Sequence, residues 1–169
     1  MEEILENNLK TVRIVIYVLV FFIIILVGIW LYKKTRLNNE NCDALSKLYP
    51  DFAKVSTIDP SQEVFSHNLR DYYIKTAFNA CLAGEIKNDF VNICALKSAI
   101  KQGARCLDFE IYSLNDRPVI AASAVDSYYT KGTYNSVDFG DALEIISDYA
   151  FSGGTSPNPG DPLLLNFRK

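Results

Sequence analysis

The chain has 169 residues, of which 49% are hydrophobic and 22% charged, and its formal net charge is −3. This length is typical of a single domain. The negative charge argues against a nucleic-acid partner, because no basic face is large enough to neutralise many phosphates.

An uncharged run of nineteen residues, residues 14–32, predicts one transmembrane helix. At 1.5 Å per residue, the run nearly spans a hydrocarbon core of about 30 Å. It is too long for the apolar part of a signal peptide, and no small-residue cleavage site follows it. We therefore divide the chain into a short N-terminal segment (1–13), the membrane helix (14–32), a juxtamembrane connector (33–68) and a C-terminal domain (69–169).

The orientation of this single-pass protein is predicted from the charges beside the run. Three Lys or Arg residues follow it closely and two precede it, so the positive-inside rule places the C-terminal domain in the cytosol by a margin of one charge. The chain has no Asn-x-Ser/Thr sequon, and its cysteines show neither a disulfide framework nor a zinc-site spacing. We expect four buried, reduced thiols: Cys42, Cys81, Cys94 and Cys106.

The first elements after the membrane run are short. The stretch "CDALSKLYPDFAKV" predicts a short helix broken at Pro50, and a β-prone piece follows at residues 72–74. A helix should then begin at Asn88 or Asp89, continue through apolar residues at helical spacing, and end at Gly103.

The stretch "ARCLDFEIYS", residues 104–113, predicts a strand with two unlike faces. Leu107, Phe109 and Ile111 share the face expected to pack on helices, because side chains alternate along a strand. The other face carries two carboxylates, Asp108 and Glu110. In an open sheet these carboxylates would face solvent, and in a barrel they would point inward and bind something. The residues alone leave both readings open.

The rest of the chain completes an α/β pattern. After a turn at "NDRP", the stretch "VIAAS" predicts a second strand. The stretch "DFGDALEIISDYAF" predicts a helix with Asp138 as its N-cap, and "LLLNF" predicts a final buried strand. We expect the apolar stripe of this helix to contain Phe139, Leu143, Ile146 and either Tyr149 or Ala150. Strands alternating with helices favour a parallel sheet covered by helices.

Five of these segments, in this order, resemble the X region of phosphatidylinositol-specific phospholipase C. They are "IKTAFNACLAG", "AIKQGARCLDFEIY", "RPVIAAS", "FGDALEIISDYAF" and "DPLLLNF". The wording of "RDYYIKTAFNAC" and "LDFEIYS" looks most similar to degenerate phospholipase-C-like proteins predicted in large DNA viruses. The resemblance implies a TIM-type barrel over residues 69–169.

That barrel would be partial. A TIM barrel needs about 200 residues or more, and only about 100 follow Leu69. We expect either a truncated reading frame, which we favour, or a half-barrel whose open sheet edges are covered by another chain or a second copy.

The resemblance also assigns site residues. The family cleaves the phosphodiester of an inositol lipid with two histidines and a calcium ion held by an asparagine and carboxylates. Its calcium-binding positions fall on Asn79, Asp108 and Glu110, with the two acids exchanged. The positions of the two catalytic histidines hold Phe78 and Ala122. A further acidic calcium ligand is replaced by Arg168, which we expect to pair with the two acids in place of the metal.

The only histidine does not restore the missing chemistry. His67 lies in "FSHN", which looks like the family's Ser-His-Asn, but no strand texture precedes it, so we interpret it as a connector residue.

Two functions follow from these residues. The first is a catalytically degenerate pseudoenzyme, without a cofactor, that serves as a binding or structural module and contacts lipid head groups, including phosphoinositides, or a protein partner. The alternative is an active phosphoric diester hydrolase of inositol phospholipids that uses other side chains and calcium. Losing one general acid or base typically costs 10²–10⁴-fold in rate, and both are absent, so we favour the first.

Overall fold

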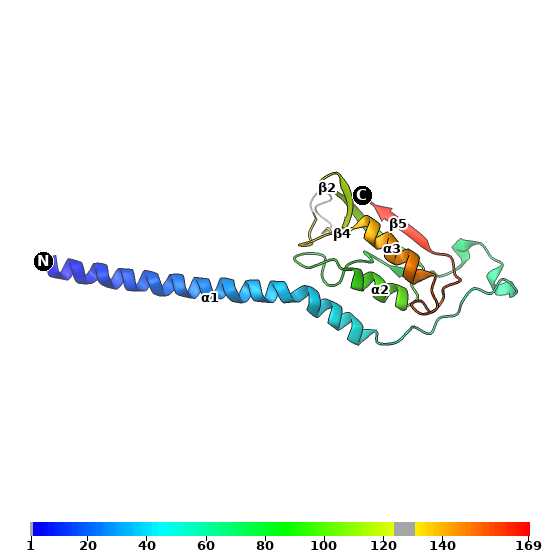
Figure 1. Ribbon diagram of the computed structural model, residues 1–169, viewed down its shortest axis with the longest axis horizontal. Coiled ribbons are helices and arrows are strands. Elements are labelled where there is room, and N and C mark those ends of the chain that lie inside the picture. The colour runs from blue at the N-terminus through cyan, green and yellow to red at the C-terminus, as the bar shows by residue number, and fades with distance from the viewer. Residues whose placement is uncertain (1, 124–130) are drawn as a thin grey trace. The chain divides into compact units, whose positions relative to one another are not determined.

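The computed structural model describes residues 2–123 and 131–169. It contains two compact units, residues 1–37 and residues 38–169 (Figure 1). Each unit is described by itself.

The first unit is a single α-helix. Helix α1 (Glu2–Leu48) begins in this unit and continues into the second without a break at the predicted end of the membrane run. Its part from Val12 onward is long and apolar enough to cross a membrane, and none of the most apolar stretch is buried in the structure. The helix predicted within "CDALSKLYP" is the last part of α1, which ends two residues before Pro50 because proline disfavours a helical residue before it.

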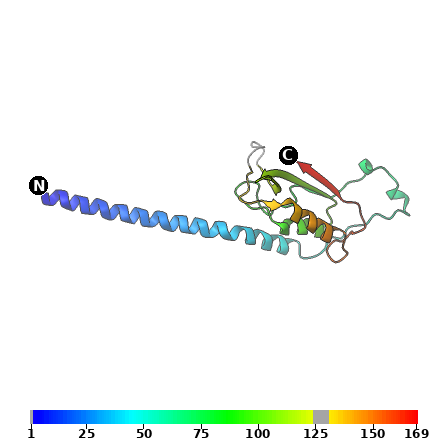
Figure 2. The same ribbon diagram turned by 45° about the horizontal axis from the view of Figure 1, so that its top comes forward.

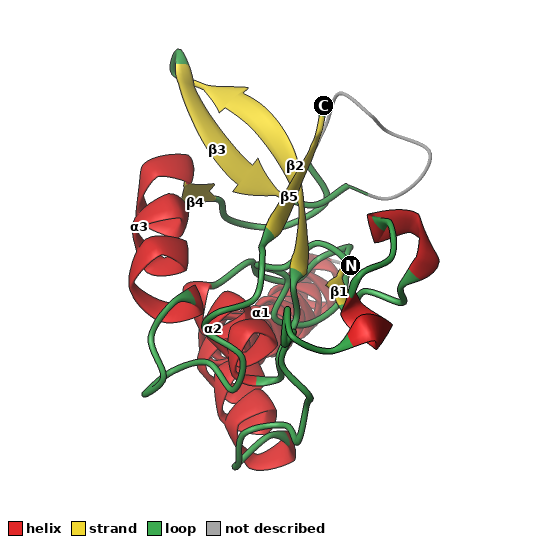
Figure 3. Cartoon of the chain, turned by 90° about the vertical axis from the view of Figure 1, so that its right-hand side faces the viewer, coloured by secondary structure: helices red, strands yellow, loops and turns green. Residues whose placement is uncertain are grey.

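The second unit is built on a five-stranded sheet: β1 (Thr76–Ala77), β2 (Cys106–Leu114), β3 (Arg117–Ala121), β4 (Val137–Asp138) and β5 (Leu164–Arg168). Strand β2 pairs in parallel with β1 and β5 and antiparallel with β3, which in turn pairs antiparallel with β4 (Figure 3). The expected parallel pairing is found for β1, β2 and β5, whereas β3 and β4 pair antiparallel. Asn115 and Asp116 have φ angles of 52° and 59°, which make a two-residue turn and send the chain straight back as a hairpin.

Two helices cover one face of this sheet, α2 (Ile93–Lys101) and α3 (Phe139–Ala150) (Figure 2). The core between them and the strands includes Leu96, Leu107 and Phe109, each at most 1% exposed. The result is a half-barrel with helices on its outside, as the family resemblance implied.

The helix starts correct one prediction and confirm another. Helix α2 starts later than expected, because Asn92 and not Asn88 or Asp89 is the N-cap and accepts a hydrogen bond from the Cys94 N–H at 2.9 Å. Asp138 caps α3 as predicted, with its carboxylate accepting from the N–H groups of Gly140 and Asp141.

The buried stripe of α3 consists of Ala142, Ile146 and Ala150. Leu143, which we expected in the stripe, is 37% exposed. The helix therefore presents small alanines to the core, and the large leucine lies at its edge.

The last strand is also more open than predicted. Strand β5 was expected to be buried, yet Leu164, Leu165 and Phe167 are 37–47% exposed. Strand β2 is the only partner of β5 in the described part of the chain, so the other edge of β5 is unpaired. A complete barrel would have a further strand at that edge.

The end of helix α1 is joined to α2 and the loop before it within the second unit. Cys42 and Cys94 form a disulfide with a Cα–Cα distance of 5.8 Å. Beside it, Asn92 Nδ2 donates to Asn38 Oδ1 at 3.0 Å, and Asn41 Nδ2 donates to Asp89 Oδ1 at 2.7 Å. The expectation of four reduced thiols is therefore wrong for two of them. Spacing could not predict this bond, because 52 residues separate the two cysteines.

Candidate functional site

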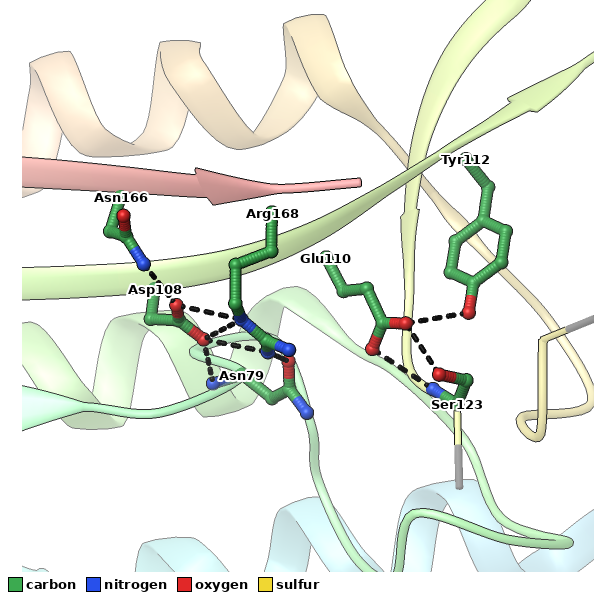
Figure 4. A network of polar contacts seen from close by, with 7 residues as sticks. All are labelled: Asn79, Asp108, Glu110, Tyr112, Ser123, Asn166 and Arg168. Carbon is green, nitrogen blue, oxygen red and sulfur yellow. Dashed lines mark hydrogen bonds and ion pairs between the residues drawn. The ribbon is translucent and has the colours of Figure 1, made fainter. Parts of the chain in front are cut away.

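Strands β2 and β5 bring the polar residues of the site onto one face. In their parallel register Asp108 lies beside Asn166, and Glu110 lies beside Arg168. Arg168 does not bond to its direct neighbour Glu110 but reaches diagonally back to Asp108. Its Nε lies 3.0 and 3.1 Å from the two carboxylate oxygens of Asp108, and its Nη2 lies 2.8 Å from Oδ2 (Figure 4). This is the forked, charge-assisted pairing that a guanidinium makes with a carboxylate.

Asn79 and Phe78 complete the surroundings of the guanidinium. Arg168 Nη2 donates to Asn79 Oδ1 at 2.6 Å, and the Asn79 N–H donates to Asp108 Oδ2 at 3.2 Å (Figure 4). Asn79 lies two residues after the end of β1 and has a φ angle of 45°, a conformation that asparagine tolerates better than most residues. The Phe78 ring lies 4.5 Å from the guanidinium carbon of Arg168, within reach of a cation–π interaction.

The charges of this pair stabilise each other. Asp108 is only 5% exposed, and burial alone would raise its pKa. The hydrogen bonds from Arg168, the Asn79 backbone and Asn166 outweigh burial and lower the pKa of Asp108 below its ordinary value. The hydrogen bond to Asp108 in turn raises the pKa of Arg168, so the pair stays ionised at neutral pH.

Glu110 belongs to a separate network. It accepts hydrogen bonds from Tyr112 Oη at 2.7 Å, from Ser123 Oγ at 2.5 Å and from the Ser123 N–H at 3.1 Å (Figure 4). Burial would raise the pKa of Glu110, and these hydrogen bonds lower it. The expected pairing of Arg168 with both acids is therefore found for Asp108 alone.

The two positions that should hold histidines differ in their surroundings. Phe78 is 63% exposed, whereas the Ala122 side chain is fully buried. The Ala122 carbonyl accepts from the N–H groups of Gly132 and Thr133 at 2.7 and 3.2 Å. A histidine at position 122 would therefore have to displace packed atoms. His67 is exposed and contacts Tyr72, and none of its described interactions involves this site.

A family model for the X domain of phosphatidylinositol-specific phospholipase C matches residues 65–166, more than half of the chain. The chain belongs to this family. No curated protein matches the chain in sequence. The family assignment agrees with the half-barrel and with the strand on which Asp108 and Glu110 lie.

Calcium, which the family implies, does not fit the phospholipase-C-like site as it stands. Asn79 Oδ1 and both oxygens of Asp108 already bind the guanidinium of Arg168. Within the described residues, no group of three or more His, Cys, Asp or Glu side chains could hold a metal ion. A cation beside the guanidinium would be repelled, and the further acidic ligand that the family has at position 168 is absent, because that residue is arginine.

Two members of the site escaped prediction from the sequence: Asn166 and Ser123. Strand alternation does place Tyr112 on the face of Asp108 and Glu110. Asn166 is two residues before Arg168 on the same strand, so strand alternation alone could have placed it on the same face. Ser123 follows β3, and only the hairpin geometry brings it to Glu110.

Proposed function

We propose that this phospholipase-C-like protein is a membrane-anchored pseudoenzyme, a binding or structural module and not a hydrolase. The observation that carries the proposal is the Arg168 guanidinium, which binds the oxygen atoms that the family would offer to calcium. The family's chemistry needs a metal cation at that place and two proton-transferring side chains, and this chain offers a fixed cation, Phe78 and Ala122.

The two histidine positions support the same conclusion. Neither a phenyl ring nor a methyl group accepts or donates a proton. One general acid or base contributes about 10²–10⁴-fold, so the loss of both removes most of the rate enhancement from such a site. The remnant of the calcium site, Asn79 and Asp108, then has a structural role: it fixes the end of β5 against β1 and β2. Glu110 fixes Ser123, just after the end of β3.

The alternative function is a phosphoric diester hydrolase of inositol phospholipids that uses Glu110, Tyr112 and Ser123. The hydrogen bond between Glu110 and the Ser123 hydroxyl at 2.5 Å favours it, because a carboxylate next to a hydroxyl can act as a general base. The lowered pKa of Glu110 counts against it, since the ideal base has a pKa near the working pH.

The membrane role rests on helix α1. We propose that residues 14–32 cross a bilayer, which keeps the domain near lipid head groups, including those of phosphoinositides, as its binding partners. The unpaired edge of β5 is a place where a second copy or another protein chain would complete the sheet.

The orientation that we now propose differs from the cytosolic placement predicted from the sequence. That prediction rested on a margin of one basic residue, and two observations agreed with it: the absence of a glycosylation sequon and cysteines expected to be reduced. The Cys42–Cys94 disulfide removes the support from the cysteines, because disulfides persist mainly in oxidising compartments. We therefore place the domain on the oxidising side of the membrane. Alkylation of intact cells without reductant should leave Cys42 and Cys94 unlabelled, and labelling of both would return the domain to the cytosol.

A hydrolysis assay tests the proposed function. The full chain in vesicles that contain phosphatidylinositol and calcium should release no more inositol phosphate than protein-free vesicles. Release that is lost in Asp108→Asn would show a working family site and contradict the pseudoenzyme. Release that is kept in Asp108→Asn but lost in Glu110→Gln would support the alternative hydrolase.

A further inference from the structure

A hollow in the domain lies away from the Arg168 site. It has a volume of about 350 Å³ and is lined by residues between Val55 and Lys75 and by residues that precede β2 or that precede or begin β5. The walls are mainly apolar or aromatic, with Val55, Ile58, Phe65, Leu69, Tyr72 and Leu164 among them. This volume lies within the range of small-molecule sites, about 300–1,000 Å³.

A buried arginine lines this hollow. Arg105 is 6% exposed, and its Nη2 donates to Ser156 Oγ at 3.2 Å and to the Asn158 carbonyl. Its Nε and Nη1 are buried without any hydrogen-bond acceptor. Two unsatisfied N–H groups on a buried cation are costly, and native proteins rarely leave them so.

The nearest acid does not satisfy this guanidinium. Asp161 also lines the hollow, but its oxygens accept from the Ile58 N–H at 2.8 Å and from Asn158 Nδ2 at 3.0 Å. Burial lowers the pKa of Arg105, and the charge of Asp161 only partly opposes this. Lys75 lines the same wall, but its Nζ donates to the Gln102 carbonyl at 2.6 Å. The unsatisfied N–H groups of Arg105 are therefore the feature of the hollow that favours a negative charge.

The hollow and the Arg168 site have no residue in common. The hollow lies where β2 and β5 begin, with Arg105 directly before β2, and the Arg168 site lies further along both strands. A ligand here would therefore not compete for the Arg168 cluster.

We propose that this hollow binds an amphiphile with an acidic head group, a carboxylate or a phosphate monoester. The head group accepts hydrogen bonds from Nε and Nη1 of Arg105 after the guanidinium turns toward the hollow, because protein atoms cover both nitrogens in the structure. The chain of the amphiphile lies along the apolar wall formed by Val55, Ile58 and Leu69. The planar guanidinium, with its fork of N–H donors, is well suited to bind a carboxylate or phosphate head group.

Equilibrium dialysis of radiolabelled octanoate against the full chain in nanodiscs tests this proposal. Binding should be saturable above that of empty nanodiscs, and Arg105→Met should weaken it at least tenfold. Leu69→Trp, which adds bulk at the apolar wall and keeps the charge, should weaken it similarly. Arg105→Lys should bind with intermediate affinity, and Arg117→Met, which removes an exposed arginine of β3, should bind as the unchanged protein does.

Competition distinguishes the sources of the anion. Octyl phosphate should displace octanoate, whereas octanol should not. If octanol displaced octanoate as strongly as octyl phosphate does, the role of the charge would be overturned. If inorganic phosphate did so, the role of the alkyl chain would be overturned. Unchanged octanoate binding by Arg105→Met would overturn the site. If Arg105→Met does not fold, which labelling of the buried Cys81 would reveal, then Arg105→Lys and Leu69→Trp decide the outcome.

Discussion

Replacing Arg168 with alanine removes the cation that fixes Asp108. Asp108 would lose three contacts of 2.8–3.1 Å and keep only those from Asn166 Nδ2 at 2.6 Å and the Asn79 N–H at 3.2 Å. Removing one partner of a fully buried ion pair costs about 3–5 kcal/mol. The side chain of Asp108 is 7% exposed but that of Arg168 is 37% exposed, so water replaces part of the lost interaction. We therefore expect a loss of about 2 kcal/mol in the free energy of unfolding, between the values for exposed and buried pairs.

Cys81 provides the assay. Its side chain is fully buried, and burial raises the pKa of its thiol to about 12, so it reacts with an alkylating reagent only when the domain opens. The second free thiol, Cys106, is replaced by serine in all variants. A loss of 2 kcal/mol predicts labelling about 30-fold faster for Arg168→Ala, since about 1.4 kcal/mol is tenfold. Arg117→Ala, at an exposed arginine in β3, is the matched control. A labelling rate for Arg168→Ala that equals the control would refute a stabilising ion pair.

Two further predictions concern the membrane anchor and the dependence of stability on pH. Deleting residues 14–32 should release the protein into the soluble fraction after carbonate washing, because this run supplies the apolarity of α1. A deletion variant that stays in the membrane would contradict the anchor. The pKa values of Asp108 and Glu110 are lowered in the folded state. The stability that they contribute is therefore complete above the pKa values of the unfolded chain, near 4, and is lost as the pH falls through the pKa values of the folded state. Circular dichroism should show that Asp108→Asn flattens this acid dependence, and an unchanged acid transition would contradict the ionised pair.

The sequence predicted those parts of the fold that local rules determine. Alternation in residues 104–113 predicted the strand and the shared face of Asp108 and Glu110, and Asp138 was correctly predicted as a cap because a carboxylate there satisfies free N–H groups. Arg168 was expected near the acids only through the family resemblance, since its place depends on which strands pair.

The failures have a common physical origin in contacts between distant segments. The Cys42–Cys94 disulfide and the cap at Asn92 depend on how the end of α1 packs against α2, which no local pattern records. The separate partners of Glu110 depend on the hairpin register, which places Ala121 opposite Glu110 and so brings Ser123 within reach of it. The exposed apolar side chains of β5 could not be predicted from "LLLNF", because their burial depends on whether a further strand is present.

The central claim is that the Arg168 guanidinium takes the place of calcium, and a calcium titration of thermal unfolding tests it most directly. The unchanged protein should show no shift in Tm with added calcium. Arg168→Glu should instead be stabilised by calcium, by about 2.7 kcal/mol when calcium is 100 times its Kd, because it adds a third carboxylate to Asp108 and Glu110. Arg168→Gln, which removes the charge without adding a carboxylate, should respond much less. A calcium-dependent rise in the Tm of the unchanged protein that disappears in Asp108→Asn would contradict the claim.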